Sequence, residues 1–315
     1  MYAITGANGF IGKHLVSYLE NKKLKFVKIG RRKGKVDFLI NDLNKETDWS
    51  RALKGIEVVF HLAARVHMVN ENRKDLYYEY ERNNSEATKK LIYDACNSGV
   101  KRIIFLSTIK VNGEKTFPGY PFSLACEPNP KDAYAISKLN AEKALLNAAK
   151  NLNIDITIIR VPLVFGPGVK ANFYKLINLI NKGIPLPFKG IKNKRSYLYV
   201  ENLVDFLFKC SKEKKAVNKI FLLADQKSLS TESLIQKISY PLGKKSNLFY
   251  MPIWVLRIAG ILLKRSNQIN KFIDSLEIDT ASSYKTLNWE APYNSDLAFK
   301  KTIDWYLNKI KIERR

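Results

Sequence analysis

The stretch TGANGFIG, which runs from Thr5 to Gly12, decides the fold that we expect for this chain. It connects a short apolar run at Tyr2–Thr5, which predicts a strand, to a helical pattern that includes Ile11 and Leu15. Glycines at such a turn allow backbone N–H groups to approach a pyrophosphate at the start of the helix. The turn therefore predicts a dinucleotide-binding site. Its glycines are Gly6, Gly9 and Gly12.

Strands and helices alternate along the first half of the chain. Further short apolar runs predict strands at 25–29, 36–40, 56–64, 102–107 and 156–161. Helical patterns lie near 88–95 and 134–151. Strands that alternate with helices of this length are typical of a parallel sheet with helices on both faces. We therefore predict an α/β fold with a Rossmann-type, doubly wound parallel sheet.

The alternation becomes irregular after the stretch FGPG at 165–168. We expect a sheet domain that binds the dinucleotide and a smaller C-terminal lobe that binds the substrate. The sheet domain comprises residues 1–165, with 195–225 returning to it, and the lobe comprises 166–194 and 226–315.

The 315-residue chain carries a formal net charge of +25. A nucleic acid, an anionic membrane surface or an anionic small molecule would each suit this charge. The lysines are spread along the whole chain, which fits a general abundance of lysine equally well. Charge alone therefore selects no partner.

Cysteine and histidine usage argues against disulfides and metals. The three cysteines form no CxxC pair, which favours a reducing compartment, and the three histidines lack the spacing of metal ligands. The chain starts directly on a predicted strand, so we expect no signal peptide and a cytoplasmic location. The most apolar window, 249–263, contains Arg257 and is shorter than the roughly 20 residues that span a bilayer.

A tyrosine and a lysine stand four residues apart in the stretch DAYAISKLNAEK. Tyr134 and Lys138 would lie on one face of the helix expected there. A lysine ammonium favours a neighbouring phenolate, so we expect Lys138 to lower the pKa of Tyr134 from its reference value near 10. Tyr134 would then act as an acid and a base near neutral pH. Ser107 and Thr108, at the end of a predicted strand, offer a hydroxyl to the same substrate oxygen.

Five stretches, taken in order, carry a family resemblance. They are the glycine turn, HLAA (61–64), STIKVNG (107–113), YAISK (134–138) and RVPLVFGPG (160–168). With them the chain resembles the extended short-chain dehydrogenase/reductase family, and within it the nucleotide-sugar enzymes grouped with UDP-glucose 4-epimerase. The resemblance covers nearly the whole chain. It implies a nicotinamide cofactor, a UDP-sugar substrate and a homodimer.

The resemblance implies roles for particular residues. Thr108 takes the place of the catalytic serine or threonine, Tyr134 is the acid and base, and Lys138 assists Tyr134 and holds the nicotinamide ribose. Asp42 and Leu43 would contact the adenine. The other residues that would line the cofactor are Gly6, Asn8, Gly9, Phe10, Ile11, Gly12, Leu62, Ala63, Ala64, Asn84 and Val161.

The resemblance also implies a site for the UDP group. Asn172, in VKANF, matches an asparagine that contacts the sugar diphosphate. Arg195, in KNKRSYLYV, matches an arginine that clamps a phosphate, a task that suits a bidentate guanidinium; alternatively, it is one more cation in a basic segment. Phe188, in PLPFKG, is a candidate for contact with the uracil. Asn112 stands where many epimerases have a tyrosine, and we assign it no role.

Two arginines stand where NAD-binding enzymes often carry an acid. Arg31 lies 19 residues after Gly12, in the stretch IGRRKG (29–34), close to the ~20 residues expected for that acid. A guanidinium pairs with the 2′-phosphate that a carboxylate would repel. Arg31 and Arg32 therefore favour NADP(H). If both side chains simply face solvent, NAD(H) is the alternative.

The cofactor bears on the reaction. In this family, 4-epimerases keep NAD bound, oxidise C4 and return the hydride, whereas a protein built for NADPH suits reduction of a keto sugar. Longer stretches such as HLAARVHMV resemble bacterial UDP-N-acetylquinovosamine dehydrogenases of O-antigen and capsule assembly. We therefore expect a 4-keto reductase that converts a UDP-4-keto-6-deoxy-N-acetylhexosamine to UDP-N-acetylquinovosamine or its epimer. The alternative is a UDP-glucose or UDP-N-acetylglucosamine 4-epimerase with bound NAD.

A nucleotide sensor or an RNA-binding protein is a different class of function for this fold. The intact set of Thr108, Tyr134 and Lys138 argues against a sensor, and the sequence lacks a basic stripe interleaved with aromatic residues. We therefore expect no nucleic-acid partner. The segment 249–265 predicts either an amphipathic helix that touches the inner membrane face or a core helix that covers the sugar site.

Overall fold

The fold is built on one parallel sheet. A computed structural model describes residues 1–31, 33, 35–66 and 73–313. In this part of the chain the main sheet has the strand order β10-β6-β5-β4-β1-β2-β3, and all neighbouring strands are parallel. Its strands are β1 (Tyr2–Thr5), β2 (Phe26–Gly30), β3 (Phe38–Leu39), β4 (Val58–His61), β5 (Arg102–Thr108), β6 (Asp155–Val161) and β10 (Lys219–Leu222). The predicted α/β, doubly wound sheet is confirmed.

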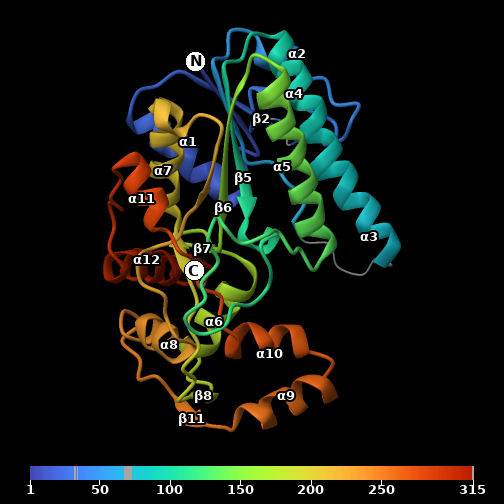
Figure 1. Cartoon of the computed structure of the whole chain (residues 1–315). Coiled ribbons are helices and arrows are strands. Elements are labelled where there is room, and N and C mark those ends of the chain that lie inside the picture. Colours follow the sequence, from blue (N-terminus) through green and yellow to red (C-terminus); the bar gives the residue numbers. More distant parts are fainter. Residues whose placement is uncertain (32, 34, 67–72, 314–315) are drawn as a thin grey trace.

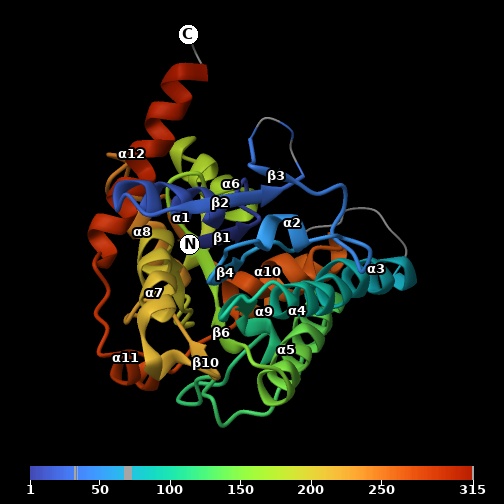
Figure 2. The same cartoon turned by 90° about the horizontal axis from the view of Figure 1, so that it is seen from above.

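Helices cover both faces of the main sheet (Figures 1 and 2). Alternate residues of β1 point to opposite faces, so Ala3 joins one core cluster while Tyr2 and Ile4 join the other. The first cluster includes side chains from α2 (Ser50–Leu53), α4 (Ala87–Asn97) and α5 (Ala133–Asn151). The second includes side chains from α1 (Phe10–Asn21), α7 (Val200–Lys212) and α11 (Ala281–Leu287).

The remaining helix of the sheet domain contains an irregular stretch. α3 (Arg73–Tyr80) continues through the π-helix η1 (Glu81–Glu86) into α4. The wider turn of a π-helix shifts the register of the side chains that follow, and such turns are frequent at functional sites. Asn84 lies in this π-helix and is buried, with 2% of its surface exposed to solvent.

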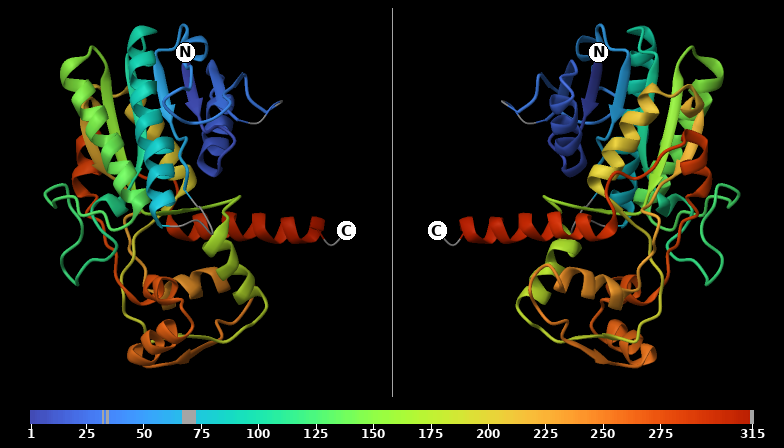
Figure 3. Two further views of the ribbon diagram at one scale, coloured as in Figure 1. Left: turned by 90° about the vertical axis from the view of Figure 1, so that its right-hand side faces the viewer. Right: turned by 90° about the vertical axis from the view of Figure 1, so that its left-hand side faces the viewer.

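The small lobe has a hydrophobic core of its own, separate from the two clusters on the main sheet. The lobe lies beyond the carboxyl ends of the strands of the main sheet (Figures 1 and 3). Phe165, Phe173 and Phe299 stack at its centre, with ring centroids 5.4 and 4.7 Å from Phe165. Helix α12 runs along the boundary between the lobe and the main sheet (Figure 3). The lobe contains α6 (Ala171–Asn181), β8 (Leu186–Lys189), α8 (Thr231–Ser239), β11 (Leu248–Tyr250), α9 (Ile253–Leu262), α10 (Ser266–Ile273) and α12 (Ser295–Glu313).

The two strands of the segment 195–225 belong to different sheets. Its first strand, β9 (Tyr197–Tyr199), pairs with β7 (Leu163–Phe165) in a separate two-stranded sheet. Helix α7, the short η3 (Lys214–Ala216) and β10 then return to the main sheet, where β10 pairs with β6. The chain thus crosses from the lobe to the sheet domain through β9.

Strand β8 contains a proline, Pro187. Proline lacks the N–H that a strand with neighbours on both sides needs. Strand β8 has one neighbour, β11, so its other side needs no backbone N–H donor. The apolar window 249–263 forms β11 and α9. No helix among the described residues has both the length and the apolar character needed to cross a membrane.

The strand order places the carboxyl ends of the central strands at one edge of the sheet. From β1 the chain passes to β2 and β3 on one side, and then to β4 on the other. Such a reversal opens a crevice beyond the carboxyl ends of the two central strands, where ligands of this fold class bind. Register pairs Thr5 with His61 and Thr108 with Val161, so the segments that follow these strands meet at this edge.

Candidate active site

The glycine turn is closed by contacts that leave no space for side chains. Gly6 has a φ of +73°, and Gly9 donates its N–H to the Gly6 carbonyl oxygen at 2.9 Å. A Cβ on Gly12 would lie 2.2 Å from the same oxygen. Helix α1 begins after Gly9 without a side-chain cap, so its first N–H groups face the turn. A bare helix N-terminus of this kind suits a phosphate group.

Asn8 supplies a second feature that fits a dinucleotide. Its Nδ2 atom is buried and has no hydrogen-bond partner in the protein. It lies beside the end of β2, because a Cβ on Gly30 would be 3.5 Å from it. A buried donor without a partner is costly unless a ligand accepts its hydrogen bond. The turn therefore fits the cofactor that the sequence predicted.

A carboxylate lies beside Arg31, the first residue after β2. Arg31 is exposed, and its Nη1 lies 3.7 Å from Asp42 Oδ1. Arg82 Nη2 also pairs with Asp42, at 2.8 Å. The sequence lacked an acid directly after β2, but the fold brings Asp42 to this place. Arg32 lies outside the described residues, and the second predicted adenine contact, Leu43, is buried in the core.

The loop after β4 packs directly on the glycine turn. The N–H groups of Leu62 and Ala63 donate to the carbonyl and hydroxyl oxygens of Thr5, at 3.2 Å each. Ala63 N would lie 2.8 Å from a Cβ on Gly6, which is a further reason for glycine there. Ala64 follows, half-buried, at the same edge of the sheet. Leu62, Ala63 and Ala64 are therefore grouped with the turn, as the sequence predicted.

His61, which the sequence left without a role, organises this loop. Its ring nitrogens contact the hydroxyls of Thr5 (2.7 Å) and Thr88 (3.0 Å). Burial lowers the pKa of His61 to about 3, with a smaller effect from the positive charge of Lys138. His61 is therefore neutral in the fold and links β1, β4 and α4.

Asn84, predicted to contact the cofactor, holds two protein segments together. Its Oδ1 accepts the Arg65 N–H at 2.8 Å, and its Nδ2 donates to the Arg65 carbonyl at 3.1 Å and to Ser137 Oγ at 3.0 Å. Both amide hydrogens are thus used within the protein. Asn84 ties the loop after β4 to helix α5, which carries Tyr134.

Three other predicted cofactor contacts lie in packed positions. Phe10 and Ile11, in the first turn of α1, pack against the core of the small lobe. Val161 ends β6 and is buried in the second core cluster. Phe10 and Ile11 therefore connect the glycine turn to the lobe, which the sequence did not predict.

Helix α5 presents Tyr134 and Lys138 at the carboxyl edge of the sheet. Asp132 caps the helix: its Oδ1 accepts the Ala135 N–H at 2.7 Å. Tyr134 lies in the first turn, and Lys138 follows on the same face. Lys138 is almost completely buried, and its Nζ lies 3.7 Å from the ring centroid of Phe105.

The predicted lowering of the Tyr134 pKa is wrong for this structure. Burial raises the pKa of Tyr134, and the negative charge of Asp132 and the neighbouring Tyr80 raise it further. Burial lowers the pKa of Lys138 to about 7, against an opposite effect of Glu142. Because Lys138 is only partly charged near neutral pH, it stabilises a phenolate less than the spacing of the two residues suggested.

A buried ion pair lies behind these residues. Arg160 on β6 holds Glu142 on α5 through Nε (3.1 Å to each oxygen) and Nη2 (2.6 Å). Glu142 also accepts the hydroxyl of Ser107, and Arg160 Nη1 donates to Asn112 Oδ1 at 3.0 Å. Asn112, left without a role by the sequence, is thus a partner of Arg160.

This network separates the two hydroxyls that end β5. Ser107 is buried and committed to Glu142. Thr108 is half-buried and accepts the Lys110 N–H at 3.3 Å. Lys110 in turn forms an ion pair with Asp132, the cap of α5. Thr108 is therefore the residue of the pair placed to meet a ligand, and Lys110 ties it to the start of α5.

The predicted substrate contacts fall in three different environments. Asn172 is exposed in the first turn of α6. Arg195 is half-buried, and its Nη1 donates to the Asp274 carbonyl at 2.9 Å. Phe188 lies in the core of the lobe, stacked on Phe272 with centroids 4.9 Å apart. Phe188 is therefore a core residue, whereas Asn172 and Arg195 keep polar atoms near the surface of the lobe.

Lys271, on α10, was missed by the sequence analysis. Burial lowers its pKa, and the positive charges of Lys110 and Arg195 lower it further, against opposite effects of Glu114 and Asp132. These three cations come from the sheet domain, the segment before β9 and the small lobe. Nothing in the sequence near Lys271 marked it, because the three residues are far apart along the chain. Their convergence suits an anionic group held between the domain and the lobe.

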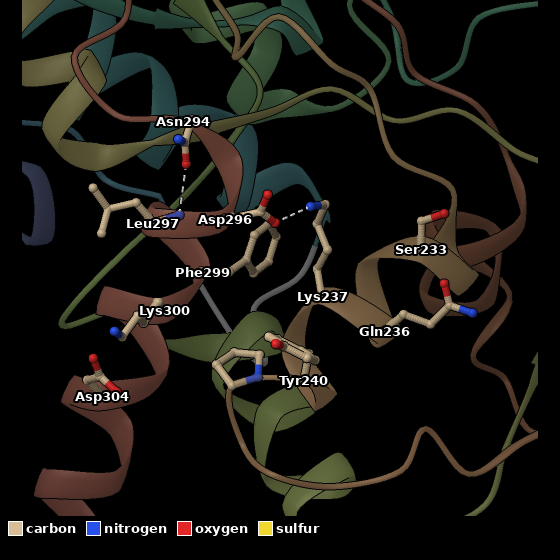
Figure 4. A pocket seen from close by; sticks show the side chains of 11 residues that line it. Ser233, Gln236, Lys237, Tyr240, Asn294, Asp296, Leu297, Phe299, Lys300 and Asp304 are labelled. Atoms are coloured by element: carbon tan, nitrogen blue, oxygen red, sulfur yellow. Dashed lines mark hydrogen bonds and ion pairs between the residues drawn. The ribbon is translucent and has the colours of Figure 1, made fainter.

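A separate pocket lies between α8 and α12 (Figure 4). Lys237 reaches across it to pair with Asp296 at 2.6 Å. None of the predicted site residues lines this pocket. Among the described residues, no group of three or more histidine, cysteine, aspartate or glutamate side chains is placed to hold a metal ion. The candidate site is therefore the edge of the sheet beside the glycine turn.

Comparison with known proteins identifies the family of the chain. A sequence model described as the NAD dependent epimerase/dehydratase family matches residues 2–224. The chain is also 38% identical over 310 residues to a UDP-glucose 4-epimerase from Vibrio cholerae, covering 96% of this chain and 94% of that protein. The chain belongs to the NAD dependent epimerase/dehydratase family. The family predicted from the five sequence stretches is confirmed, and the protein is an enzyme of this family.

Solved structures agree on the fold. The structure of MoeE5 in complex with UDP-glucose and NAD has a TM-score of 0.78 at 23% identity, covering 98% of this chain and 99% of that one. The UDP-N-acetylglucosamine 4-epimerase from Bacillus cereus has a TM-score of 0.77 at 20% identity, covering 96% and 94%. The match over nearly the whole length includes the small lobe as well as the Rossmann sheet.

Breaking the buried ion pair should destabilise the protein strongly. We expect Glu142→Gln or Arg160→Met to lower the free energy of unfolding by about 3–5 kcal/mol, because each leaves a buried polar group without its partner. The double variant should lose less than the sum of the two. Urea unfolding measures these losses. As a control, Asp155→Asn, which breaks the more exposed pair with Arg102, should cost about 1 kcal/mol or less. Equal losses for the two pairs would contradict this account.

The neutral state of His61 should make stability depend on pH. The pKa of His61 is about 3 in the fold and about 6.5 in an unfolded chain. The unfolded state therefore binds more protons between these values, and stability falls as the pH decreases from 6.5 towards 3. Relative to His61→Gln, the wild-type free energy of unfolding should fall by up to about 1.4 kcal/mol per pH unit. Parallel curves for the two proteins would show that His61 is not responsible.

Proposed function

We propose that this protein is a UDP-sugar 4-epimerase that uses a bound nicotinamide dinucleotide at the edge of the main sheet. The observation that carries the proposal is the near-full-length similarity, at 38% identity, to a UDP-glucose 4-epimerase. The site geometry supports it, because Tyr134, Lys138 and the half-buried Thr108 come from the same edge of the sheet as a turn that fits a dinucleotide. The reaction would oxidise C4 of the sugar and return the hydride to the opposite face.

Tyr134 is the proposed acid and base at C4. Its raised pKa keeps the phenol protonated in the protein alone, so it donates a proton readily and needs help to accept one. When bound, the oxidised nicotinamide supplies the hydride acceptor and a positive charge that favours the phenolate. Lys138, with a pKa of about 7, adds a positive charge that varies near neutral pH. Thr108 orients the C4 oxygen.

The proposed cofactor is NAD(H). The MoeE5 structure was solved with NAD, and Asp42 places a carboxylate 3.7 Å from Arg31. That carboxylate neutralises part of the charge on which the sequence-based preference for NADP(H) depends. It also offers an acceptor for ribose hydroxyls, the role usually taken by an acid directly after β2.

A 4-keto reductase remains the second candidate. The observation in its favour is the sequence at the end of β2, where Gly30 and Arg31 take the place of an acid. A guanidinium there suits the 2′-phosphate of NADPH. The product would be UDP-N-acetylquinovosamine or its C4 epimer, for bacterial surface polysaccharide. This candidate uses the same Thr108, Tyr134 and Lys138.

The small lobe is the proposed holder of the nucleotide-sugar diphosphate. Burial is the main cause of the lowered pKa of Lys271, and repulsion by the positive charges of Lys110 and Arg195 adds to it. A bound diphosphate would relieve that repulsion. We therefore propose that residues 1–165, with 200–225, hold the cofactor, and that Arg195, Lys271 and Asn172 contact the substrate.

Replacing Tyr134 by phenylalanine should slow turnover strongly and spare cofactor binding. The variant keeps the ring that packs against Tyr80 but removes the proton that moves in the reaction. We expect kcat to fall by about 10²–10⁴-fold, the usual contribution of a positioned acid or base. Turnover of UDP-sugars and the dissociation constant of NAD should be measured together. Phenylalanine-variant activity close to the wild type would refute the role of Tyr134.

Two assays on one preparation distinguish the candidate reactions. An epimerase interconverts UDP-glucose with UDP-galactose, or UDP-N-acetylglucosamine with UDP-N-acetylgalactosamine, without added nucleotide. A reductase consumes NADPH or NADH when supplied with UDP-4-keto-6-deoxy-N-acetylglucosamine, and loses absorbance at the reduced-nicotinamide band in step with product. We expect epimerisation without added nucleotide. Absorbance loss without epimerisation would replace the first candidate by the second.

A further inference from the structure

One face of helix α9 is apolar and open to solvent. Its outward stripe includes Trp254 (65% exposed), Ile261 (67%) and Leu262 (76%). The opposite face is fixed, because Leu256 is buried and a Cβ on Gly260 would lie 3.2 Å from Ile269 on α10. Helix α9 therefore cannot turn this stripe inward without giving up its packing on α10. The alternative prediction for this segment, a core helix, would bury these side chains, whereas they are exposed.

The adjoining strand extends the apolar surface. Phe249 and Tyr250 on β11 are exposed, and so are Ile258 on α9 and Leu263 just beyond it. Strand β11 and α9 lie at the end of the lobe far from β1 and β2 (Figure 1). Apolar and aromatic side chains gathered on one exposed end are unusual for a soluble surface and mark a contact site. We refer to the exposed residues of 249–263 as the α9 surface.

Positive charges surround the α9 surface. Residues 240–273 contain six lysines and arginines and no aspartate or glutamate. Lys264 and Arg265 are exposed immediately after α9, and Lys189 is exposed on β8, opposite Tyr250. The cations of 240–273 are Lys244, Lys245, Arg257, Lys264, Arg265 and Lys271. Arg257 pairs with Asp274, the next residue after this segment, at 3.0 Å, and the other cations leave an excess of positive charge around the α9 surface.

We propose that the α9 surface docks the protein on an anionic phospholipid membrane. A short helix with aromatic and aliphatic side chains on one face lies in the interface, with its apolar face between the headgroups and the acyl chains. Lysines and arginines beside it meet anionic headgroups. At 1.5 Å per residue, α9 is roughly 15 Å long, which suits lying on a bilayer rather than crossing it.

A second copy of the chain is a poorer occupant. A symmetric dimer through the α9 surface would bring the same patch of each copy together. Each patch carries cations of 240–273 and offers no acidic residue from that segment to the other. Like charges would then face each other, which disfavours the contact. An anionic membrane complements both the apolar and the charged parts of this surface. The proposal does not depend on which sugar nucleotide the enzyme uses.

Vesicle binding tests the proposal. The full chain should co-sediment with vesicles of phosphatidylglycerol and phosphatidylcholine, more weakly with phosphatidylcholine alone, and more weakly as salt is raised. The double variant Trp254→Ser/Ile261→Ser should lose at least about tenfold in affinity for the anionic vesicles, because it removes the apolar anchors. Lys264→Gln/Arg265→Gln should lose the preference for phosphatidylglycerol. Tyr93→Ser, which changes an exposed aromatic residue on α4, should bind as the wild type does.

Two further readouts keep the test decisive. Trp254 fluorescence should shift to shorter wavelength when vesicles are added, and the shift should be absent in the Trp254→Ser/Ile261→Ser variant. Circular dichroism shows whether each variant is folded. Failure of the wild type to sediment with anionic vesicles would overturn the proposal. It would also be overturned if light scattering showed that the same variant converts a dimer into a monomer while vesicle binding is absent.

Discussion

The buried ion pair between Glu142 and Arg160 joins the elements on which the candidate site depends. Glu142 belongs to α5, which carries Tyr134 and Lys138, and Arg160 belongs to β6. Ser107 on β5 and Asn112 in the loop beyond it complete the network. An ion pair this deeply buried is costly unless all its hydrogen bonds are made, and here its members come from adjacent elements. The strands and the helix that carry Thr108 and Tyr134 are thereby joined by two charges that are buried from solvent.

The sequence predicted those parts of the molecule that depend on local patterns. The glycine turn, the central strands and the long helix of Tyr134 each follow from residues close together in the chain. Buried parallel strands are nearly continuous apolar runs, as in Ile103, Ile104 and Phe105, so their positions were visible without the fold. The edge strand β3 was overestimated, because an edge strand pairs on one side and its Leu39 is exposed.

Properties that depend on burial or on distant partners could not be predicted in the same way. The spacing of Tyr134 and Lys138 was read correctly, but their pKa values follow from desolvation, which a sequence does not display. No acid follows β2 directly in the sequence, but the chain folds back through β3 and places the carboxylate of Asp42 beside Arg31. The site therefore contains an acid that the local sequence does not show. Lys271 is likewise a candidate only because the fold brings it near Arg195 and Lys110, which come from other parts of the chain.

The path of the chain between its two cores limits how this protein can be altered. It leaves the sheet domain after β7, returns through β9 and α7, leaves again for α8 to α10, and packs back on the sheet through α11 before α12. The small lobe is therefore not a module that can be cut out at one junction. Exchange of the whole lobe between relatives would disturb both cores at several joints. If the lobe holds the nucleotide sugar as proposed, new sugar preferences are more easily acquired by replacing individual loops and side chains of the lobe, without change to the sheet domain.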